Sequence, residues 1–493
     1  MSLERIGGSL LTYLSPAPRS RGVLTLATLS RVGTGAMHAR LLPFALLLAG
    51  LLTWYYLWLL AFWPGVLGND SIAILMEVDG TSAFPSGKTV FWYFFIRLLY
   101  GATGRVEVPI AVALCLSALV FARILGWCWA QGLRKTCLFG LVFIAAAPHL
   151  VFFLATLYPD GLFAVGSVGL LFELWLCARR RAVSAGSVGM LALTLPLALF
   201  MRSNGLLWLA PVVVVLLMLD RRGRAALGAL LTLWCVLGYV ASQVHSARPQ
   251  GAMFPMVLFE TVQFMRPHAM NDLWRTYPGM NDPWVQKEPM VSDETAALLR
   301  RHRPLENMLA YSDPAYWDML IFHPQGPQLG GLSEPDRQTL IREFWRYNLW
   351  HNLPSFAGSR MTVFLTAALA EGGFPALGYA PVVLPRTKAV STFRYFDLPR
   401  LESWLARLLK ASHAARWLLW APWLGLALLC WGARHSVARR DAALALLVWP
   451  MVMQLGAIAL FASAGEYRYL LPFFVLPLAL MPALALSGQT QHT

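Results

Sequence analysis

Charged residues are scarce in this chain of 493 residues. Asp, Glu, Lys and Arg together make up 13% of it, against roughly 25% in a typical soluble domain, whereas 57% is hydrophobic. This balance excludes a disordered chain and an ordinary soluble enzyme. Apolar runs of about 20 residues, the length that crosses a bilayer core roughly 30 Å thick, recur along the chain. The sequence therefore predicts an all-α polytopic membrane protein.

We predict about ten transmembrane helices, joined by connections of very uneven charge. The expected spans are 41–63, 107–130, 136–155, 160–178, 184–201, 204–220, 225–243, 413–432, 441–463 and 468–488. The segments rich in Arg and Lys, from the N-terminal arm to the connection before the ninth span, then all fall on one side. Cytoplasmic loops carry such an excess, so we expect both termini in the cytoplasm. The net charge of +15 is thereby explained by the orientation of the protein in the membrane, and binding of nucleic acid is not expected.

Cysteine is also sparse and lies in the wrong places for a disulfide framework. All six cysteines fall in predicted spans: Cys115, Cys128, Cys137, Cys177, Cys235 and Cys430. The N-terminus lacks a short apolar core with a small-residue cleavage site. We therefore expect residues 1–40 to remain as a basic cytoplasmic arm, with the first span as an uncleaved anchor.

The remaining chain divides into three predicted parts. Residues 41–243 form an N-terminal transmembrane module whose first exterior loop is 64–106, and 413–493 form the C-terminal helices with a short tail. Between them, 244–412 forms an exterior lobe that we expect to be mixed and loop-rich. Two apolar stretches, 89–100 and 354–370, carry an Arg and are predicted to lie along the outer interface, where such side chains snorkel.

Outside the lobe and the cytoplasmic loops only seven acids remain, and six of them sit in outer loops or at outer helix ends. Asp70 follows Trp63-Pro64-Gly65, where the first span leaves the membrane. A carboxylate shielded there can have a raised pKa and act as a general base, or it can simply cap a helix. Asp160, after Tyr158-Pro159, offers the same two interpretations. Any chemistry is therefore expected on the exterior face.

Two further outer turns carry isolated charges. In Arg202-Ser203-Asn204-Gly205 the guanidinium is either an interfacial anchor or a phosphate contact, for which its geometry is suited. In Gly465-Glu466-Tyr467-Arg468-Tyr469 an acid and a base bracket a tyrosine, although Tyr and Arg are also common at membrane interfaces.

Three other features have simpler explanations. Ser86-Gly87-Lys88-Thr89 has the wrong glycine spacing for a phosphate loop and faces outward, so only Lys88 remains as a candidate anion contact. Arg123 and Glu173 lie in neighbouring spans and are expected to form a structural ion pair. His149, inside the third span, is expected to be a packed polar residue.

The order of these turns, with Asp70, Asp160, Arg202 and Glu466/Arg468 on one side, resembles the GT-C superfamily of polytopic glycosyltransferases, which use polyprenyl-phosphate-linked sugars. The chain looks closest to bacterial families similar to the protein mannosyltransferases and lipid A aminoarabinose transferases. The resemblance covers about 41–220 and 464–488, and Asn69 stands where many members have a second acid. It implies a GT-C-like bundle in the bacterial inner membrane.

The resemblance also implies roles for these residues. Asp70 would be the general base of an inverting transfer, and Asp160 would orient a substrate or join Asp70 at a divalent cation, Mg or Mn. The expected substrate-binding residues are Lys88, Tyr158, Arg202, Asn204, Glu466 and Arg468. The expected partners are a polyprenyl-phosphate-linked sugar and an acceptor glycan, lipid or protein of the cell envelope. The alternatives are an O-antigen ligase or polymerase relying on Arg301-His302-Arg303, a transporter, and a structural scaffold.

Overall fold

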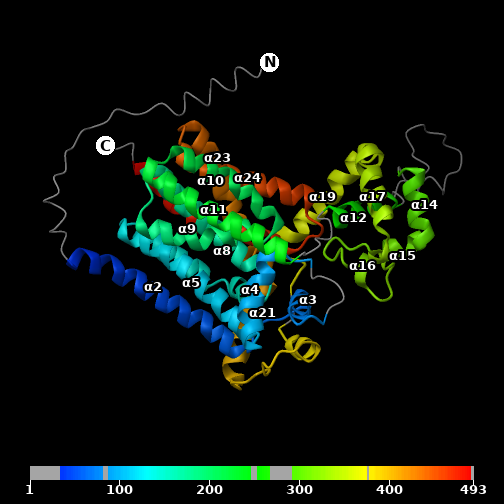
Figure 1. Cartoon of the computed structure of the whole chain (residues 1–493), viewed down its shortest axis with the longest axis horizontal. Helices are drawn as coiled ribbons and strands as arrows, with labels where there is room; N and C mark the ends of the chain where they lie inside the picture. The colour runs from blue at the N-terminus through cyan, green and yellow to red at the C-terminus, as the bar shows by residue number, and fades with distance from the viewer. Residues whose placement is uncertain (1–33, 82–86, 246–252, 267–290, 375–376, 490–493) are drawn as a thin grey trace, which may run out of the picture.

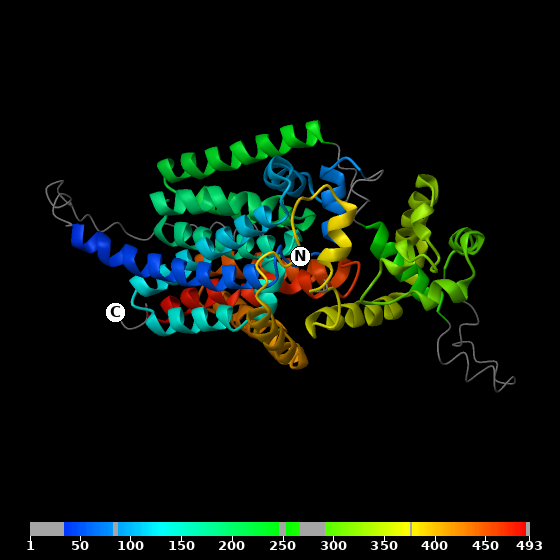
Figure 2. The same cartoon turned by 90° about the horizontal axis from the view of Figure 1, so that it is seen from below.

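The computed structural model describes residues 34–81, 87–245, 253–266, 291–374 and 377–489, so most of the predicted arm 1–40 lies outside it. Across these residues the chain is helical, and its only β-structure is two isolated bridges, which confirms the all-α prediction. A long bundle of roughly parallel and antiparallel helices occupies one part of the molecule, and a smaller helical lobe extends from one end of it (Figures 1 and 2).

The bundle contains the helices of both predicted transmembrane parts. Its elements are α2 (Thr34–Ala61), α5 (Glu107–Ala130), α6 (Arg134–Ala145), α7 (Pro148–Leu154), α8 (Pro159–Arg180), α9 (Ala185–Leu199), η2 (Ser203–Trp208), α10 (Leu209–Met218), α11 (Arg221–Val244), α23 (Trp423–Ala438), α24 (Ala442–Phe461), η6 (Tyr467–Leu470), α25 (Leu471–Val475) and α26 (Pro477–Gln489).

Six helical segments of the described chain are long and apolar enough to cross a membrane, or up to eight if two bent helix pairs each form one span. The bent pairs are α6 with α7, and α21 (Pro399–Ala414) with the helices that follow it to Ala438. Two of the ten predicted spans, 184–201 and 204–220, correspond to shorter helices of 15 residues and of 16 residues including the 3-10 turn η2. Among the described residues, six to eight segments are therefore long enough to cross a membrane, and the predicted count of ten is not confirmed.

Helix α8 is the centre of the bundle, because every residue from Pro159 to Ala178 is buried. Its glycines permit this close packing. A Cβ added at Gly166 would lie 2.5 Å from Leu197 Cβ of α9, and one at Gly169 would lie 2.7 Å from Val120 Cγ1 of α5. Small residues let helix backbones approach closely in membranes. This central position places the first residues of α8 in the middle of one end of the bundle.

Short helices cover that end of the bundle (Figure 1). They are α3 (Asn69–Val78), α4 (Val90–Thr103), α20 (Ala380–Val383), η5 (Leu384–Arg386), α21 and α22 (Arg416–Leu419). Thr89 caps α4 by accepting a hydrogen bond from Trp92 N at 3.4 Å, and Gly104 ends it in a left-handed conformation. The predicted stretch 89–100 is therefore a helix of 14 residues that packs on α3 and α11 at the bundle end.

The lobe has a hydrophobic core of its own. It is built from α12 (Phe254–Phe264), α14 (Asp293–His302), α15 (Leu305–Ala310), α16 (Met319–Phe322), η3 (Leu329–Gly331), α17 (Glu334–Glu343), the π-helical turn η4 (Phe344–Asn348) and α18 (Leu349–His351). The mixed character that we predicted for it is wrong, because its described residues contain helices and no strand. Helix α14 shows why: Ser292 caps it, acids occupy its first turn and bases its last, which suits the helix dipole.

Helix α19 (Leu353–Ala368) joins the lobe to the bundle. Figure 2 shows it extending from the bundle end toward the lobe along the general direction of the bundle helices, rather than flat across the interface as predicted for 354–370. Instead of snorkelling, Arg360 is buried, pairs with Glu260 of α12 and donates a hydrogen bond to Ala462 O at 2.6 Å. Burial raises the pKa of Glu260 to about 7, against the opposing charge of Arg360.

Candidate functional site

Four turns meet at the end of the bundle that faces the lobe. The turn after α2 is fixed to the turn before α8, because Val66 N donates to Ala155 O at 2.9 Å and Val66 forms a bridge with Thr156. Gly65 makes this contact feasible: its φ is +124°, and an added Cβ would lie 2.3 Å from Ile110 Cδ1. Asp70 and Asp160 are thereby held on neighbouring segments.

The other two turns are fixed in a similar way. Thr89 Oγ1 donates to Met201 O at 3.0 Å, which ties the residue after Lys88 to the residue before Arg202. Glu466 forms a bridge with Gly372, and Tyr467 N donates to Gly372 O at 3.1 Å. These contacts hold the backbone segments that carry the charged side chains.

Asp70 lies between two cations. Lys88 Nζ is 2.5 Å from Asp70 Oδ2, and Arg468 donates to the same oxygen through Nη1. The side chain of Asp70 is 24% exposed, that of Lys88 18% and that of Arg468 12%. These three side chains are therefore largely, but not completely, shielded from solvent.

Asp160 lies deeper and joins the same network. Its side chain is 1% exposed, and it accepts a hydrogen bond from Arg202 Nη1. Arg468 Nη1 is 3.9 Å from Asp160 Oδ2, and Arg468 Nε donates to Glu466. Arg468 is thus shared by three carboxylates, and the three acids and three bases of this charged cluster balance one another. The charged cluster is defined here as Asp70, Lys88, Asp160, Arg202, Glu466 and Arg468.

Two tyrosines line the guanidinium groups of the charged cluster. Arg468 Cζ lies 5.0 Å from the ring centroid of Tyr158, and Arg202 Cζ lies 4.8 Å from that of Tyr469. At such distances the ring attracts the cation and helps to orient it. Tyr158 was expected at the site from the sequence, whereas no role was predicted for Tyr469. Its position one residue after Arg468 was the only available signal.

Burial and neighbouring charges shift the pKa values of the side chains in the cluster. Burial alone would raise the pKa of Asp70, but the cations of Lys88 and Arg468 outweigh burial, so the pKa lies well below its ordinary range. The sequence left open a raised pKa for Asp70, and the pKa in this arrangement is shifted in the opposite direction. Burial lowers the pKa of Lys88, against the attraction of Asp70, and burial also lowers the pKa of Arg202. Burial and the neighbouring Asp70 raise the pKa of the Tyr158 hydroxyl.

Asn204 lies in η2 near the cluster, and its Oδ1 atom is buried without a hydrogen-bond partner among the described residues. No hydrogen bond joins this oxygen to the charged side chains within that part of the chain. Asn69 instead engages the segment after α19, because Tyr379 donates from its hydroxyl to Asn69 Oδ1 at 3.0 Å.

The residues do not fit a divalent cation. A metal held by Asp70 and Asp160 would have to displace Lys88, Arg202 and Arg468, which already pair with these carboxylates. The described residues contain no group of three or more His, Cys, Asp or Glu side chains placed to hold a metal ion.

The other polar residues singled out in the sequence lie elsewhere. Arg123 Nε donates to Glu173 Oε1 at 2.9 Å, which is the expected ion pair. His149 is fully buried and packs on the rings of Trp420 and Phe474. The segment Arg301-His302-Arg303 ends α14, which lies on the side of the lobe remote from the bundle (Figure 1).

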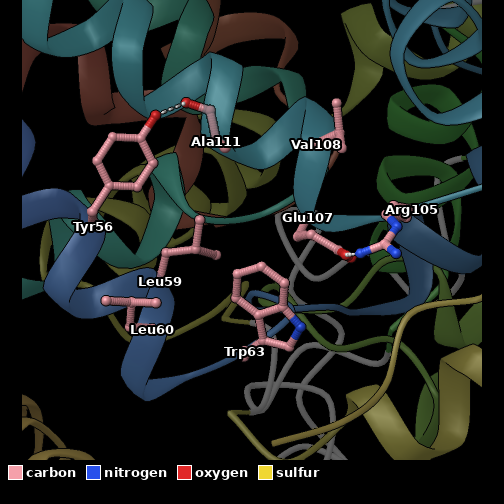
Figure 3. A pocket seen from close by; sticks show the side chains of 8 residues that line it. All are labelled: Tyr56, Leu59, Leu60, Trp63, Arg105, Glu107, Val108 and Ala111. Atoms are coloured by element: carbon pink, nitrogen blue, oxygen red, sulfur yellow. Dashed lines mark hydrogen bonds and ion pairs between the residues drawn. The ribbon is translucent and has the colours of Figure 1, made fainter. Parts of the chain in front are cut away.

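A hollow of about 470 Å³ opens between α2 and α5, away from the charged cluster (Figure 3). It is lined by Tyr56, Leu59, Leu60, Trp63, Arg105, Glu107, Val108 and Ala111. The Glu107 carboxylate forms an ion pair with Arg105 at 3.6 Å and accepts a hydrogen bond from the hydroxyl of Ser391. The hollow is therefore mostly apolar and shares no residue with the charged cluster.

Comparison of the chain with protein-family models, with curated proteins and with solved structures finds no match.

Proposed function

We propose that this chain is a membrane glycosyltransferase of the GT-C type, which moves a sugar from a polyprenyl-phosphate carrier to an acceptor at the exterior face of a bacterial inner membrane. The observation that carries the proposal is the charged cluster. Carboxylates and cations from the four outer turns, together with Lys88 from the segment before α4, meet at one end of an apolar helical bundle. About ten spans, with the two short helices α9 and α10 counted among them, and cytoplasmic termini belong to the same proposal.

The cluster has the groups that such a transfer requires. The acceptor oxygen attacks the anomeric carbon, the bond from that carbon to the phosphate oxygen breaks, and the electron pair leaves with the phosphate. Cations must stabilise the charge that gathers on the departing phosphate, and Lys88, Arg202 and Arg468 are suited to this. A single displacement inverts the anomeric centre.

Asp70 is the proposed acceptor of the proton from the attacking hydroxyl. In the resting arrangement its ion pairs with Lys88 and Arg468 make it a weak base, because they hold its pKa low. A bound phosphate would draw these two cations toward itself and weaken their hold on Asp70. The basicity of Asp70 would then rise only when the donor is in place, so that donor binding prepares the base.

The proposal is tested by Asp70→Asn and Asp70→Ala, assayed in membranes with undecaprenyl-phosphate-linked sugars. Both variants should lose at least 100-fold of the donor turnover, as expected when a general base is removed. Asp293→Asn is the matched control, because Asp293 is an exposed acid of the lobe. Turnover at the wild-type rate by both Asp70 variants would contradict the assignment.

Arg202 provides a second, separate test of the phosphate role. Arg202→Ala should raise the KM for the donor or lower kcat by at least tenfold, since one cation facing the phosphate is lost. Arg202→Lys keeps the charge without the forked geometry, so its kinetic constants should lie between those of wild type and Arg202→Ala. An unchanged rate for Arg202→Ala would remove Arg202 from this role.

A further inference from the structure

A short segment of the lobe reaches back to the charged cluster. Pro314 O accepts a hydrogen bond from Gly465 N at 2.6 Å, directly before Glu466 in the chain. Ala315 lies beside Gly372, since a Cβ added at this glycine would be 2.8 Å from Ala315 Cβ. The segment, Gly372 and the Glu466 turn are therefore packed against one another, and the lobe contributes part of the wall of the site.

Asp318 lies one turn further along this segment, at the start of α16. Its carbonyl accepts from Ile321 N at 3.0 Å and from Phe322 N at 2.8 Å, which fixes the backbone that carries the side chain. The residue is half-buried, and its carboxylate interacts electrostatically with Glu466, Asp70 and Arg468. Asp318 therefore lies within electrostatic range of the charged cluster, on a segment of the lobe that packs beside the Glu466 turn.

The charge of Asp318 is not compensated as the other acids of the site are. Asp70, Asp160 and Glu466 each pair with a cation of the cluster. Among the described residues no cation forms an ion pair with the carboxylate of Asp318, and the hydrogen bond that it accepts comes from its own backbone N–H. Burial raises its pKa, and the negative charges of Glu466 and Asp70 raise it further.

The chemistry of this group indicates which substrate it would bind. An uncompensated carboxylate repels the donor phosphate, so the phosphate belongs on the side of Lys88, Arg202 and Arg468. A carboxylate binds groups that donate hydrogen bonds, and the hydroxyl groups of an acceptor are such donors. The two substrates of a transfer reaction would then be held by different groups, the donor phosphate by the cations and the acceptor by Asp318.

We propose that Asp318 is an acceptor-binding residue, which accepts a hydrogen bond from a hydroxyl group of a polyhydroxylated acceptor and orients it toward the anomeric carbon of the donor. This inference rests on the proposed function. It assigns the lobe a direct part in acceptor selection, through one side chain that no motif in the sequence marks.

The test measures the two KM values of wild type and Asp318→Asn separately. The donor is the undecaprenyl-phosphate-linked sugar that wild type turns over, and the acceptor source is a detergent-solubilised envelope extract from cells that lack the chain. Asp318→Asn should raise the apparent KM for the extract at least tenfold while changing the KM for the donor less than threefold. Asp318→Glu should recover part of the loss, and Asp293→Asn again serves as the control.

A pH series gives a readout that a purely structural role would not change. The ionised carboxylate binds the hydroxyl, and it is lost as pH falls through its pKa. Burial, Glu466 and Asp70 raise this pKa, against the opposing effect of Arg468. As pH is lowered, acceptor binding should therefore begin to weaken at pH values above those at which an ordinary carboxyl group is protonated. In Asp318→Asn the apparent KM for the extract should lose this acid dependence.

The outcomes separate this inference from the proposed function. If wild type turns over no lipid-linked donor, both proposals are wrong. If wild type transfers the sugar and Asp318→Asn shows the wild-type KM for the extract at every pH, only the role of Asp318 is wrong.

Discussion

Among single residues, Arg468 has the most electrostatic partners at the site. It donates to Glu466 two positions away and to Asp70, 398 positions earlier in the chain, and it lies 3.9 Å from Asp160. The sequence marked Arg468 as a rare charge in a short outer turn. It could not indicate these partners, because no local pattern relates residues so far apart.

Arg468→Ala should destabilise the protein as well as inactivate it. Asp70 and Asp160 would each keep another cation of the charged cluster. The buried Glu466 would lose its partner in the charged cluster, and breaking a buried ion pair in this way costs about 3–5 kcal/mol. We expect a clear fall in the thermal unfolding temperature in detergent and at least a 100-fold fall in donor turnover. Arg468→Lys should recover stability more than activity, because an ammonium keeps the charge but not the fork.

Arg400→Ala is the control for this prediction, since Arg400 is exposed on α21. Unfolding of Arg468→Ala at the wild-type temperature would show that the network contributes little to the fold.

Among the elements, short turns rather than long helices determine the geometry of the site. The turn between α9 and η2 carries Arg202, and it closes on itself because Gly205 N donates to Arg202 O at 2.9 Å. The sequence identified this turn from its Arg-Ser-Asn-Gly composition. The close approach of Gly205 to α9 emerges only when the two elements pack.

Gly205→Ala should shift the turn that carries Arg202, although Gly205 is not itself a member of the charged cluster. An added Cβ would lie 2.3 Å from Ala198 O and 2.7 Å from Leu199 O, and these backbone atoms cannot easily move aside. Overpacking of this kind costs about 1–3 kcal/mol. We expect a lower unfolding temperature and a higher KM for the donor.

Gly189→Ala is the matched control, because Gly189 lies in the neighbouring helix α9 and an added Cβ there meets nothing within 4 Å. It should be neutral or slightly stabilising, as alanine favours a helix. Equal behaviour of the two variants would argue against a tight turn at Gly205.

For the whole molecule, the arrangement separates a large apolar bundle from a lobe with its own core. Acids and bases are also separated along the bundle: Asp160 begins α8, whereas Arg179 and Arg180 end it. If the basic end faces the cytoplasm, the charged cluster and the lobe face outward.

Cysteine labelling tests this orientation. In a background in which the exposed native cysteines Cys115, Cys235 and Cys430 are replaced by serine, Tyr395→Cys should react with an impermeant maleimide in intact spheroplasts. Arg180→Cys should react only after the membrane is permeabilised, because it would lie on the cytoplasmic side. The opposite pattern would place the charged cluster in the cytoplasm.

The sequence alone determined that the chain is helical and has segments suited to a membrane, because long apolar runs with few charges favour membrane-spanning helices. It also identified Asp70, Asp160, Arg202 and Arg468, because so few charges lie near the outer ends of the helices. Only the tertiary structure decided that these charges neutralise one another, that this pairing holds the pKa of Asp70 low, and that the lobe brings Asp318 beside them. Ionisation depends on neighbours in space, and those neighbours are set by the packing of turns that lie hundreds of residues apart.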